Sequence, residues 1–332
     1  MFRSNRNSNR GGTGGTNANR SDNFSRQTSH LIPAEVRLLS SCHSVQSSVD
    51  AAAAYEGGLP DPVNRAGGVA TAAYLEILYA AANLQQQQQQ QQHEKSGIGY
   101  QNKVQQQNNL TFQQILLELR DRLNEQGYDQ IPQLTSSRPL ELQKTPFDLS
   151  CQGTQRALLI AINYYGQEGQ LSGCHNDIHC VKHYLKTVQG FQERNIVTLM
   201  DDGYHRKPSK QEIIRAMQLL VQDSMPGDVV YVHYSGHGGL MPPEANDFKA
   251  KNKGYDETIY PLDHAYAGQI RDFSCTLANM FSRKMNCTKG LICCNVLVFT
   301  AVWLILFFLV LFCCAFFQYI DTLCNPCDKG SS

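Results

Sequence analysis

Apolar residues in the middle of the chain follow two alternating patterns. Three short, almost fully apolar runs are typical of strands buried on both faces of a sheet: residues 157–163, 195–200 and 229–234. The segments between them carry apolar residues at helical spacing, first at Ile178, Val181 and Leu185. The second segment begins with a capping box formed by Ser209 and Glu212. Strand, helix, strand, helix, strand with short connections predicts an α/β fold with a mainly parallel sheet.

The first 150 residues have a different texture. They are rich in Asn, Ser, Gly, Ala and Gln and include an unbroken glutamine run at 85–92. Such a sequence buries too little apolar surface to offset the entropy of ordering it, so we expect residues 1–150 to be mostly disordered. Two islands, at 69–84 and 110–124, predict helices that either dock loosely or bind a partner.

Residues 273–332 form a third region, and no charged residue occurs between positions 291 and 317. A helix over 296–317 would rise about 33 Å, which is enough to cross a bilayer. We therefore expect a transmembrane helix at 291–317, with a buried core helix as the alternative. Basic residues precede this segment and predict a cytoplasmic catalytic region that is tail-anchored to a membrane: Arg283, Lys284 and Lys289.

Charge and cysteine content exclude several classes of protein. The 332 residues include 29 basic and 29 acidic ones, and a formal net charge of zero argues against nucleic acid as a partner. The 12 cysteines are scattered, and the N-terminus lacks the apolar core of a secretory signal. We therefore expect reduced thiols in the cytoplasm rather than a disulfide framework.

The strongest candidate for chemistry directly follows the third predicted strand. There, His237 lies between glycines in the segment YSGHGG. The working groups of parallel α/β sheets gather at the carboxyl ends of strands, and glycines let a substrate carbonyl approach the backbone. This placement predicts that His237 is a general base and that the Gly238 amide stabilises an oxyanion. A turn histidine with no catalytic duty is the alternative.

Six segments between residues 155 and 272 carry a family resemblance: RALLIAINYYG, LSGCHND, NIVTLMDD, RAMQLLVQD, PGDVVYVHYSGHGG and YDETIYPLDHAYAGQIRD. Together they resemble the first half of the catalytic domain of type I metacaspases, which are caspase-like cysteine endopeptidases of the peptidase C14 family. The resemblance implies a caspase-hemoglobinase three-layer sandwich, incomplete here, over residues 151–272, with residues 1–150 as a low-complexity prodomain. It also implies peptide hydrolysis through a Cys–His dyad in which His237 matches the base.

The resemblance further implies a substrate pocket. The family's pocket residues match Cys174, Asp177 and Ser235 in this chain. A carboxylate in the pocket favours a cationic side chain, so the implied partners are peptides or proteins that are cleaved after Arg or Lys. The alternative for Asp177 is a carboxylate that only interacts with the dipole of its helix.

Calcium is the cofactor that the resemblance implies, as an activator. Two of the family's calcium ligands match Asp256 and Asp272, but the third position holds Phe273. Two carboxylates make a poor cage for an ion that takes six to eight oxygens, so we expect weak calcium binding. A separate metal site is conceivable where histidines recur every fourth residue, at positions 175, 179 and 183, although a solvated polar helix face explains the same pattern.

The nucleophile of the dyad is not identifiable. The family carries it in a D-x-C-H-S-G segment on the fourth strand, and no such segment follows Asp272. Cys275 comes too early, and Cys293 and Cys294 open the apolar run, where a buried thiol is inert. Three explanations compete: a truncated or intron-retaining sequence of an active peptidase, a membrane-tethered and catalytically dead pseudoprotease that acts as a binding or regulatory module, or an unrecognised cysteine in altered geometry. In each case the third strand should have an unpaired outer edge that favours aggregation.

Overall fold

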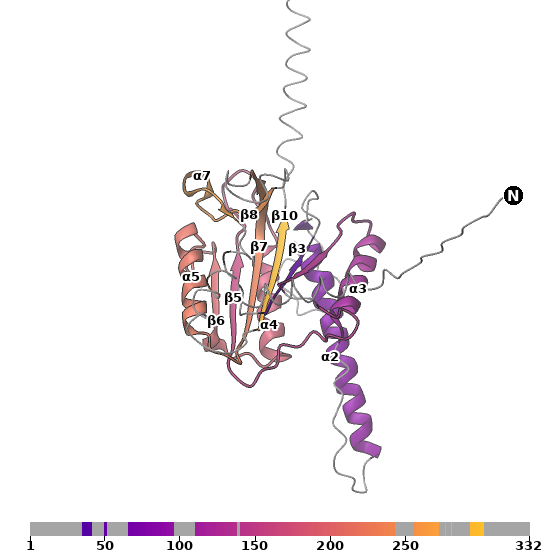
Figure 1. Ribbon diagram of the computed structural model, residues 1–332. Coiled ribbons are helices and arrows are strands. Elements are labelled where there is room, and N and C mark those ends of the chain that lie inside the picture. The colour runs from indigo at the N-terminus through magenta and orange to yellow at the C-terminus, as the bar shows by residue number, and fades with distance from the viewer. Residues whose placement is uncertain are drawn as a thin grey trace, which may run out of the picture.

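The computed structural model describes nine parts of the chain: residues 35–41, 50–51, 66–95, 110–137, 140–242, 255–271, 276, 280 and 293–301. For residues 293–301 the description covers the backbone alone. The described elements form an eight-stranded mixed sheet with helices around it (Figure 1). The main path through this sheet has the strand order β4-β1-β10-β7-β5-β6.

The three predicted strands are parallel neighbours. They are β5 (Gln155–Ala161), β6 (Ile196–Met200) and β7 (Val229–Met241), and β5 lies between the other two. Their apolar runs fit a position with helices on both faces, because such strands have no solvent-facing side. The predicted α/β architecture with a mainly parallel sheet is confirmed. β7 continues seven residues further than the apolar run predicted and carries the His237 segment into the sheet.

Two crossover helices connect these strands. Helix α4 (Cys174–Thr187) buries the predicted stripe of Ile178, Val181 and Leu185. The short η1 (Glu193–Asn195) precedes β6, and α5 (Lys210–Asp223) follows it. The Ser209 side chain accepts a hydrogen bond from the Glu212 amide, which confirms this half of the predicted capping box. The Ser209 amide donates to the Lys207 carbonyl instead of the Glu212 side chain. Because the two crossovers run in opposite directions across the sheet, right-handed connections place α4 and α5 on opposite faces.

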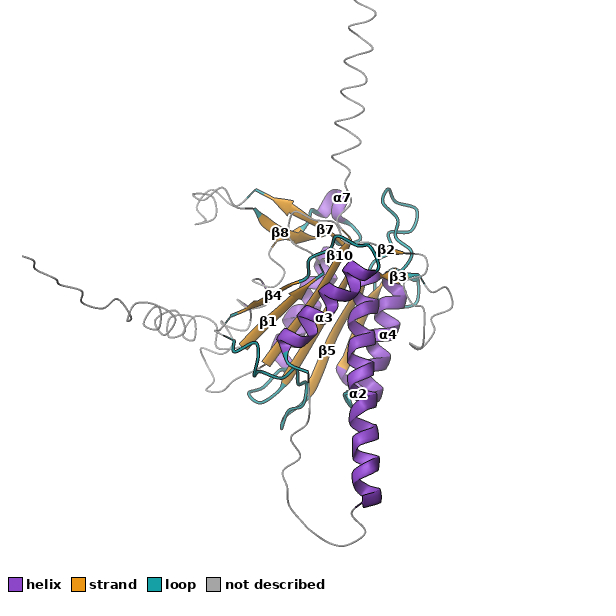
Figure 2. Cartoon of the chain, turned by 90° about the vertical axis from the view of Figure 1, so that its right-hand side faces the viewer, coloured by secondary structure: helices purple, strands orange, loops and turns teal. Residues whose placement is uncertain are grey.

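The N-terminal region contributes ordered elements, which corrects the expectation of disorder for these parts of residues 1–150. β1 (Glu35–Ser40) pairs with β4 (Gln133–Ser136), while β2 (Asp50–Ala51) pairs with β3 (Gly67–Gly68). Two helices confirm the two predicted islands: α2 (Val69–Lys95) and α3 (Phe112–Glu125). Figure 2 shows α2 and α3 on the same face of the sheet as α4. Composition misled here because tertiary packing supplies the apolar contacts that the segment lacks by itself.

Strand β10 (Cys293–Ala301) corrects the prediction of a transmembrane helix over 291–317. It lies between β7 and β1 and is parallel to both, so its backbone is hydrogen-bonded on both edges. An apolar run without periodicity fits a strand buried on both faces as well as a membrane helix. The remaining apolar stretch, 302–317, lies outside the described residues. No helix within the described ranges is long and apolar enough to cross a membrane.

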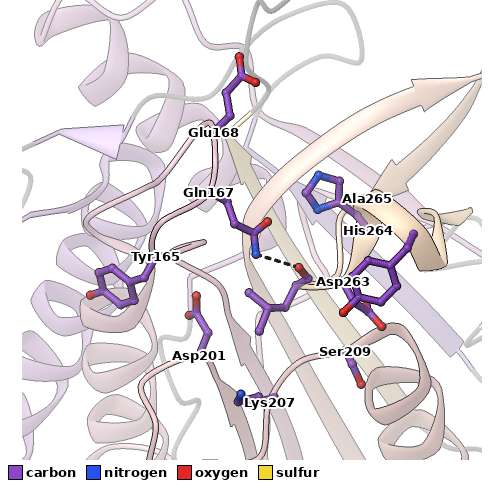
Figure 3. A pocket seen from close by; sticks show the side chains of 11 residues that line it. Tyr165, Gln167, Glu168, Asp201, Lys207, Ser209, Asp263, His264 and Ala265 are labelled. Carbon is purple, nitrogen blue, oxygen red and sulfur yellow. Dashed lines mark hydrogen bonds between the residues drawn. The ribbon is translucent and has the colours of Figure 1, made fainter.

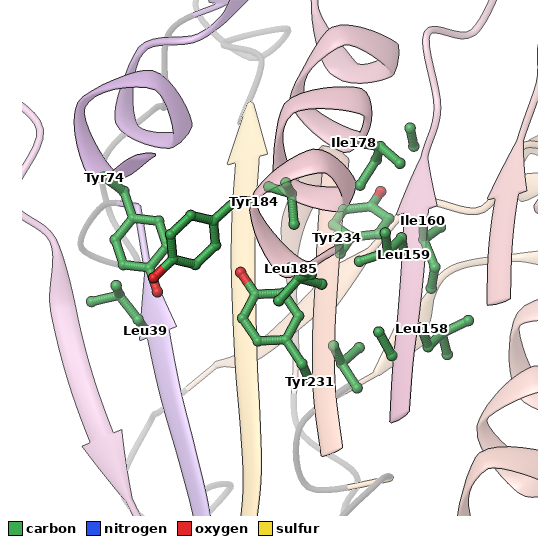
Figure 4. Close-up of a cluster of buried hydrophobic side chains, with 14 of the residues drawn as sticks. Leu39, Tyr74, Leu158, Leu159, Ile160, Ile178, Tyr184, Leu185, Tyr231 and Tyr234 are labelled. Carbon is green, nitrogen blue, oxygen red and sulfur yellow. The ribbon is translucent and has the colours of Figure 1, made fainter. Parts of the chain in front are cut away.

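Strand β10 also pairs with the outer edge of β7, so the expectation of an unpaired edge on the third predicted strand is wrong. On the face covered by α2 and α4, three buried tyrosines from different elements come together: Tyr74, Tyr184 and Tyr231 (Figure 4). Beyond the carboxyl end of β7, the chain folds back through β8 (Asp256–Ile259), α7 (His264–Ala267) and β9 (Ile270–Arg271).

Candidate active site

The backbone of His237 is held by three tyrosines at the carboxyl end of the sheet. Its amide donates a hydrogen bond to the Tyr164 hydroxyl at 3.0 Å. Its carbonyl accepts one from the Tyr260 amide at 3.0 Å and one from the Tyr234 hydroxyl at 2.7 Å. Burial raises the pKa of the Tyr164 hydroxyl well above its usual value, so this group keeps its proton and donates it to the Tyr260 carbonyl at 2.6 Å. The histidine therefore has a fixed position.

The imidazole of His237 is oriented by the loop after β5. Its Nε2 atom lies 2.5 Å from the carbonyl oxygen of Gly169, and its ring lies 4.6 Å from that of Tyr164, centroid to centroid. A carbonyl only accepts hydrogen bonds, so Nε2 carries the hydrogen and Nδ1 is the basic nitrogen of the neutral ring. Gly169 has a φ of +77°, and a Cβ atom there would lie 3.1 Å from Nε2. The sequence analysis missed this glycine, whose signal is its place in a short polar loop.

Tyr164 has the only positive φ, 54°, among the described non-glycine residues. Asp201, which follows β6, holds this turn by accepting hydrogen bonds from the amides of Asn163 and Tyr164 at 2.9 and 2.8 Å. The same carboxylate lies 2.6 Å from Nε2 of His175. Burial alone would raise the pKa of Asp201, but the hydrogen bonds from His175 and the two amides outweigh it, and the pKa is lowered. The carboxylate therefore stays charged and keeps the turn closed.

The three predicted pocket residues come together on the α4 side of the sheet. Asp177 is fully buried, and its Oδ2 atom accepts a hydrogen bond from the Ser235 hydroxyl at 2.5 Å. Its Oδ1 atom accepts one from the amide of Gly68 at 3.0 Å. Cys174 is buried one turn earlier on α4, where its amide donates to the Asn163 side chain. Asp177 lies in the first turn of its helix, yet its carboxylate binds groups of β7 and β3. No sequence motif indicated Gly68.

Gly238 lies next to the base with an amide that the β7–β8 ladder does not use. The Tyr260 amide donates to the His237 carbonyl, which makes Gly238 and Ile259 a non-hydrogen-bonded pair of the antiparallel ladder. In such a pair the two amides point away from the partner strand. The geometry is therefore compatible with the predicted oxyanion role.

The described residues do not fit a calcium site. On β8, the carboxylate of Asp256 lies 3.0 Å from a guanidinium nitrogen of Arg271, so a positive charge is already in place there. Arg271 also donates to the Pro242 carbonyl. Asp272, the second predicted ligand, lies outside the described residues. Within those ranges, no three histidine, cysteine or acidic side chains form a cluster that could hold a metal.

The histidine row on α4 is likewise not a metal site in the described structure, and it is not simply a solvated face. His175 binds Asp201, and Nδ1 of His183 lies 2.9 Å from the Tyr79 hydroxyl on α2. Burial is the main cause of a lowered pKa at His179. These side chains connect α4 to its neighbours.

Strand β10 occupies the side of His237 on which a nucleophile is expected. Ala301 is the register partner of His237, whereas Cys293 is paired with Val229 at the other end of the strand. Eight residues at about 3.3 Å each separate the two ends by roughly 26 Å, which excludes Cys293 and Cys294 as partners of the imidazole. The sequence contains no cysteine between positions 295 and 312. Cys275 lies outside the described residues.

Comparisons with known proteins identify the family of the chain. The family model "Metacaspase, peptidase C14 domain" matches residues 155–294. The protein "Metacaspase III c" of Phaeodactylum tricornutum is 36% identical over 255 residues, which cover 76% of this chain and 68% of that protein. "Metacaspase-1A" of Aspergillus oryzae is 47% identical over 125 residues, which cover 37% of this chain and 29% of that protein. The crystal structure of protein GSU0716 from Geobacter sulfurreducens aligns with 44% of this chain and 49% of that one, at 25% identity and a TM-score of 0.31, too low to carry an argument.

A histidine and a buried carboxyl group lie at the carboxyl edge of a mainly parallel α/β sheet. The chain belongs to the metacaspase family, the cysteine-type peptidases of class C14. The family match reaches residue 294, so the expectation that the resemblance ends at Asp272 is wrong. The diatom match is longer than everything after residue 154, so it includes part of the N-terminal region. The assignment to type I within the family stays a prediction.

Proposed function

We propose that this site binds peptides through an Arg or Lys side chain and that His237 occupies the place of the base that a Cys–His dyad would use for cleavage after that residue. The buried carboxylate of Asp177 carries this proposal. Its two oxygens accept hydrogen bonds from the Ser235 hydroxyl and the Gly68 amide, which fix the carboxyl group at the edge of the sheet. A carboxylate in this place favours a cationic side chain.

The chemistry assigned to the imidazole follows from its orientation. Gly169 fixes the hydrogen on Nε2, so Nδ1 would take the proton of an attacking thiol. The thiolate would attack the scissile carbonyl, and the Gly238 amide would bind the resulting oxyanion. The imidazolium would then return its proton to the leaving amine, and water would release the acyl group. Because Ala301 stands beside His237 and no cysteine follows before position 313, we expect this chain to bind arginyl peptides with little or no hydrolysis.

Peptide binding by the full-length chain tests the pocket. The probe is a fluorescent peptide that contains one arginine, measured by anisotropy, with a second peptide in which glutamine replaces the arginine. Asp177→Asn should weaken binding of the arginyl peptide by at least about 30-fold, since it removes one partner of a desolvated charge pair. Asp121→Asn, an exposed change on α3, is the control and should leave the affinity unchanged. Equal affinity for both peptides would overturn the proposal.

Calcium activation and a cytoplasmic location remain predictions, and a membrane contact remains one only for the apolar stretch that follows β10. For calcium, Arg271 already neutralises Asp256, so adding the ion should leave the affinity for the arginyl peptide unchanged. For the membrane, the apolar stretch beyond β10 counts 16 residues and would rise only about 24 Å as a helix, less than the hydrocarbon core of a bilayer.

A further inference from the structure

A cavity of about 720 Å³ opens beside the base, between the loop after β5, the start of α5 and α7 (Figure 3). Its wall combines aromatic, acidic and basic side chains, of which six matter here: Tyr165, Glu168, Asp201, Lys207, Asp263 and His264. The side chain of Gln167 closes one side by donating to the Leu262 carbonyl at 3.1 Å.

The buried ring of Tyr164 packs between His237 and the cavity wall. The ring of Tyr164 lies 4.6 Å from that of His237 and 6.0 Å from that of His264, which lines the cavity. The wall is supplied by the β6 end and the start of α5, whereas Asp177 lies on α4, on the other face of the sheet. His237 thus lies between the acidic pocket and the cavity.

Two of the four charged side chains in the cavity wall, Asp201 and Asp263, are already hydrogen-bonded. Asp201 binds His175 and two backbone amides, and Asp263 accepts a hydrogen bond from the Lys210 amide at 2.8 Å. The side chains of Glu168 and Lys207, by contrast, make no hydrogen bond or ion pair within the described part of the chain. Figure 3 shows these two residues at opposite ends of the cavity, with Lys207 below Asp201. Lys207 is exposed, and it is the lysine among the residues that line the cavity.

We propose that this cavity binds the part of the peptide that follows the cleaved bond and that Lys207 selects an acidic side chain there. The inference rests on the proposed function, because a peptide whose arginine fills the Asp177 pocket must continue past His237 across the sheet edge. A chain advances about 3.3 Å per residue, so the second or third residue after the arginine reaches the far side of the Tyr164 ring. An uncommitted ammonium group at that place attracts a carboxylate and repels a second cation.

Reversing the charge at position 207 tests the inference in the full-length chain. Three fluorescent peptides are identical up to and including one arginine and the residue after it, and carry Glu, Gln or Lys at the next two positions. The wild type should bind the Glu peptide about 10-fold more tightly than the Lys peptide at low salt, and Lys207→Glu should reverse this order. Lys144→Glu, which changes an exposed lysine that does not line the cavity, should leave the order as in the wild type.

The outcomes separate the two proposals. If all three peptides bind equally to the wild type while Asp177→Asn still abolishes binding, the assignment of the cavity is overturned and the arginine pocket stands. If Asp177→Asn leaves binding of all three peptides intact, the proposed function fails, and the cavity assignment falls with it. Reversal by Lys207→Glu, with an unchanged requirement for arginine, supports both.

Discussion

Strands β7 and β10 are parallel neighbours in register over nine residue pairs, yet only one of them carries chemistry. β7 is rich in polar and aromatic groups, and His237 lies where it meets the catalytic edge. β10 ends opposite His237 at Ala301 and is almost entirely apolar. The fold thus places the end of β10 beside His237, which lies within β7, and the residue that β10 supplies there is an alanine. A complete site needs a base and a nucleophile, because a base without a nucleophile cannot form an acyl-enzyme.

The largest expected effect comes from placing a cysteine on β10 beside His237. In Ala301→Cys, the new thiol lies on the strand position paired with His237 and on the same face, because register partners share a face. We expect hydrolysis of an arginyl peptide to rise on the order of 10³-fold over the wild type, as the imidazole can then act as a general base.

Thr300→Cys is the matched control, since successive residues of a strand point to opposite faces. It should remain inactive and react with a thiol reagent at the rate of an ordinary cysteine, which mass spectrometry of the labelled peptide measures. If both variants behave alike, β10 does not present Ala301 to His237 as described.

A smaller effect should come from removing a polar group from the interior of β7. His233 is fully buried, and burial lowers its pKa to about 3. As the pH falls below about 6.5, the unfolded chain takes up a proton that the folded chain refuses, so stability is lost on acidification. Between pH 6.5 and 4.5 this costs about 2 kcal/mol of unfolding free energy.

His233→Leu makes this position like Leu297, its register partner on β10. Denaturant unfolding at several pH values should show a flatter decline for the variant than for the wild type over this interval. Parallel curves for the two proteins would mean that His233 is accessible to protons in the folded state.

The smallest effect concerns the N-terminal contact with the pocket. A Cβ atom on Gly68 would lie 2.9 Å from Oδ2 of Asp177, so Gly68→Ala must displace the carboxylate or the strand. We expect binding of the arginyl peptide to weaken about fivefold, by roughly 1 kcal/mol. Ala80→Ser, on the exposed side of α2, should have no effect. An unchanged affinity in Gly68→Ala would show that the N-terminal region does not shape the pocket.

Local patterns predicted the elements that depend on neighbours in the sequence. The apolar runs of β5, β6 and β7, the stripe of α4 and the cap at Ser209 are all present in the structure. They could be predicted because strand burial, helical spacing and capping are decided within a few residues. The apolar run at 293–301 was assigned to a membrane helix because the same composition suits a doubly buried strand, and only its two neighbours in the sheet decide between them.

The sequence by itself determined the α/β class, because strand burial and helical spacing are decided within a few residues, and its motifs indicated the family. The catalytic role of His237 and the pocket roles of Cys174, Asp177 and Ser235 stay predictions. Only the tertiary structure decided that Gly169 orients the imidazole, that Gly68 binds Asp177 and that β10 stands beside the base. These contacts join residues far apart in the chain, and most of them use backbone groups. Every residue has the same carbonyl and amide, so no side-chain pattern could have revealed them.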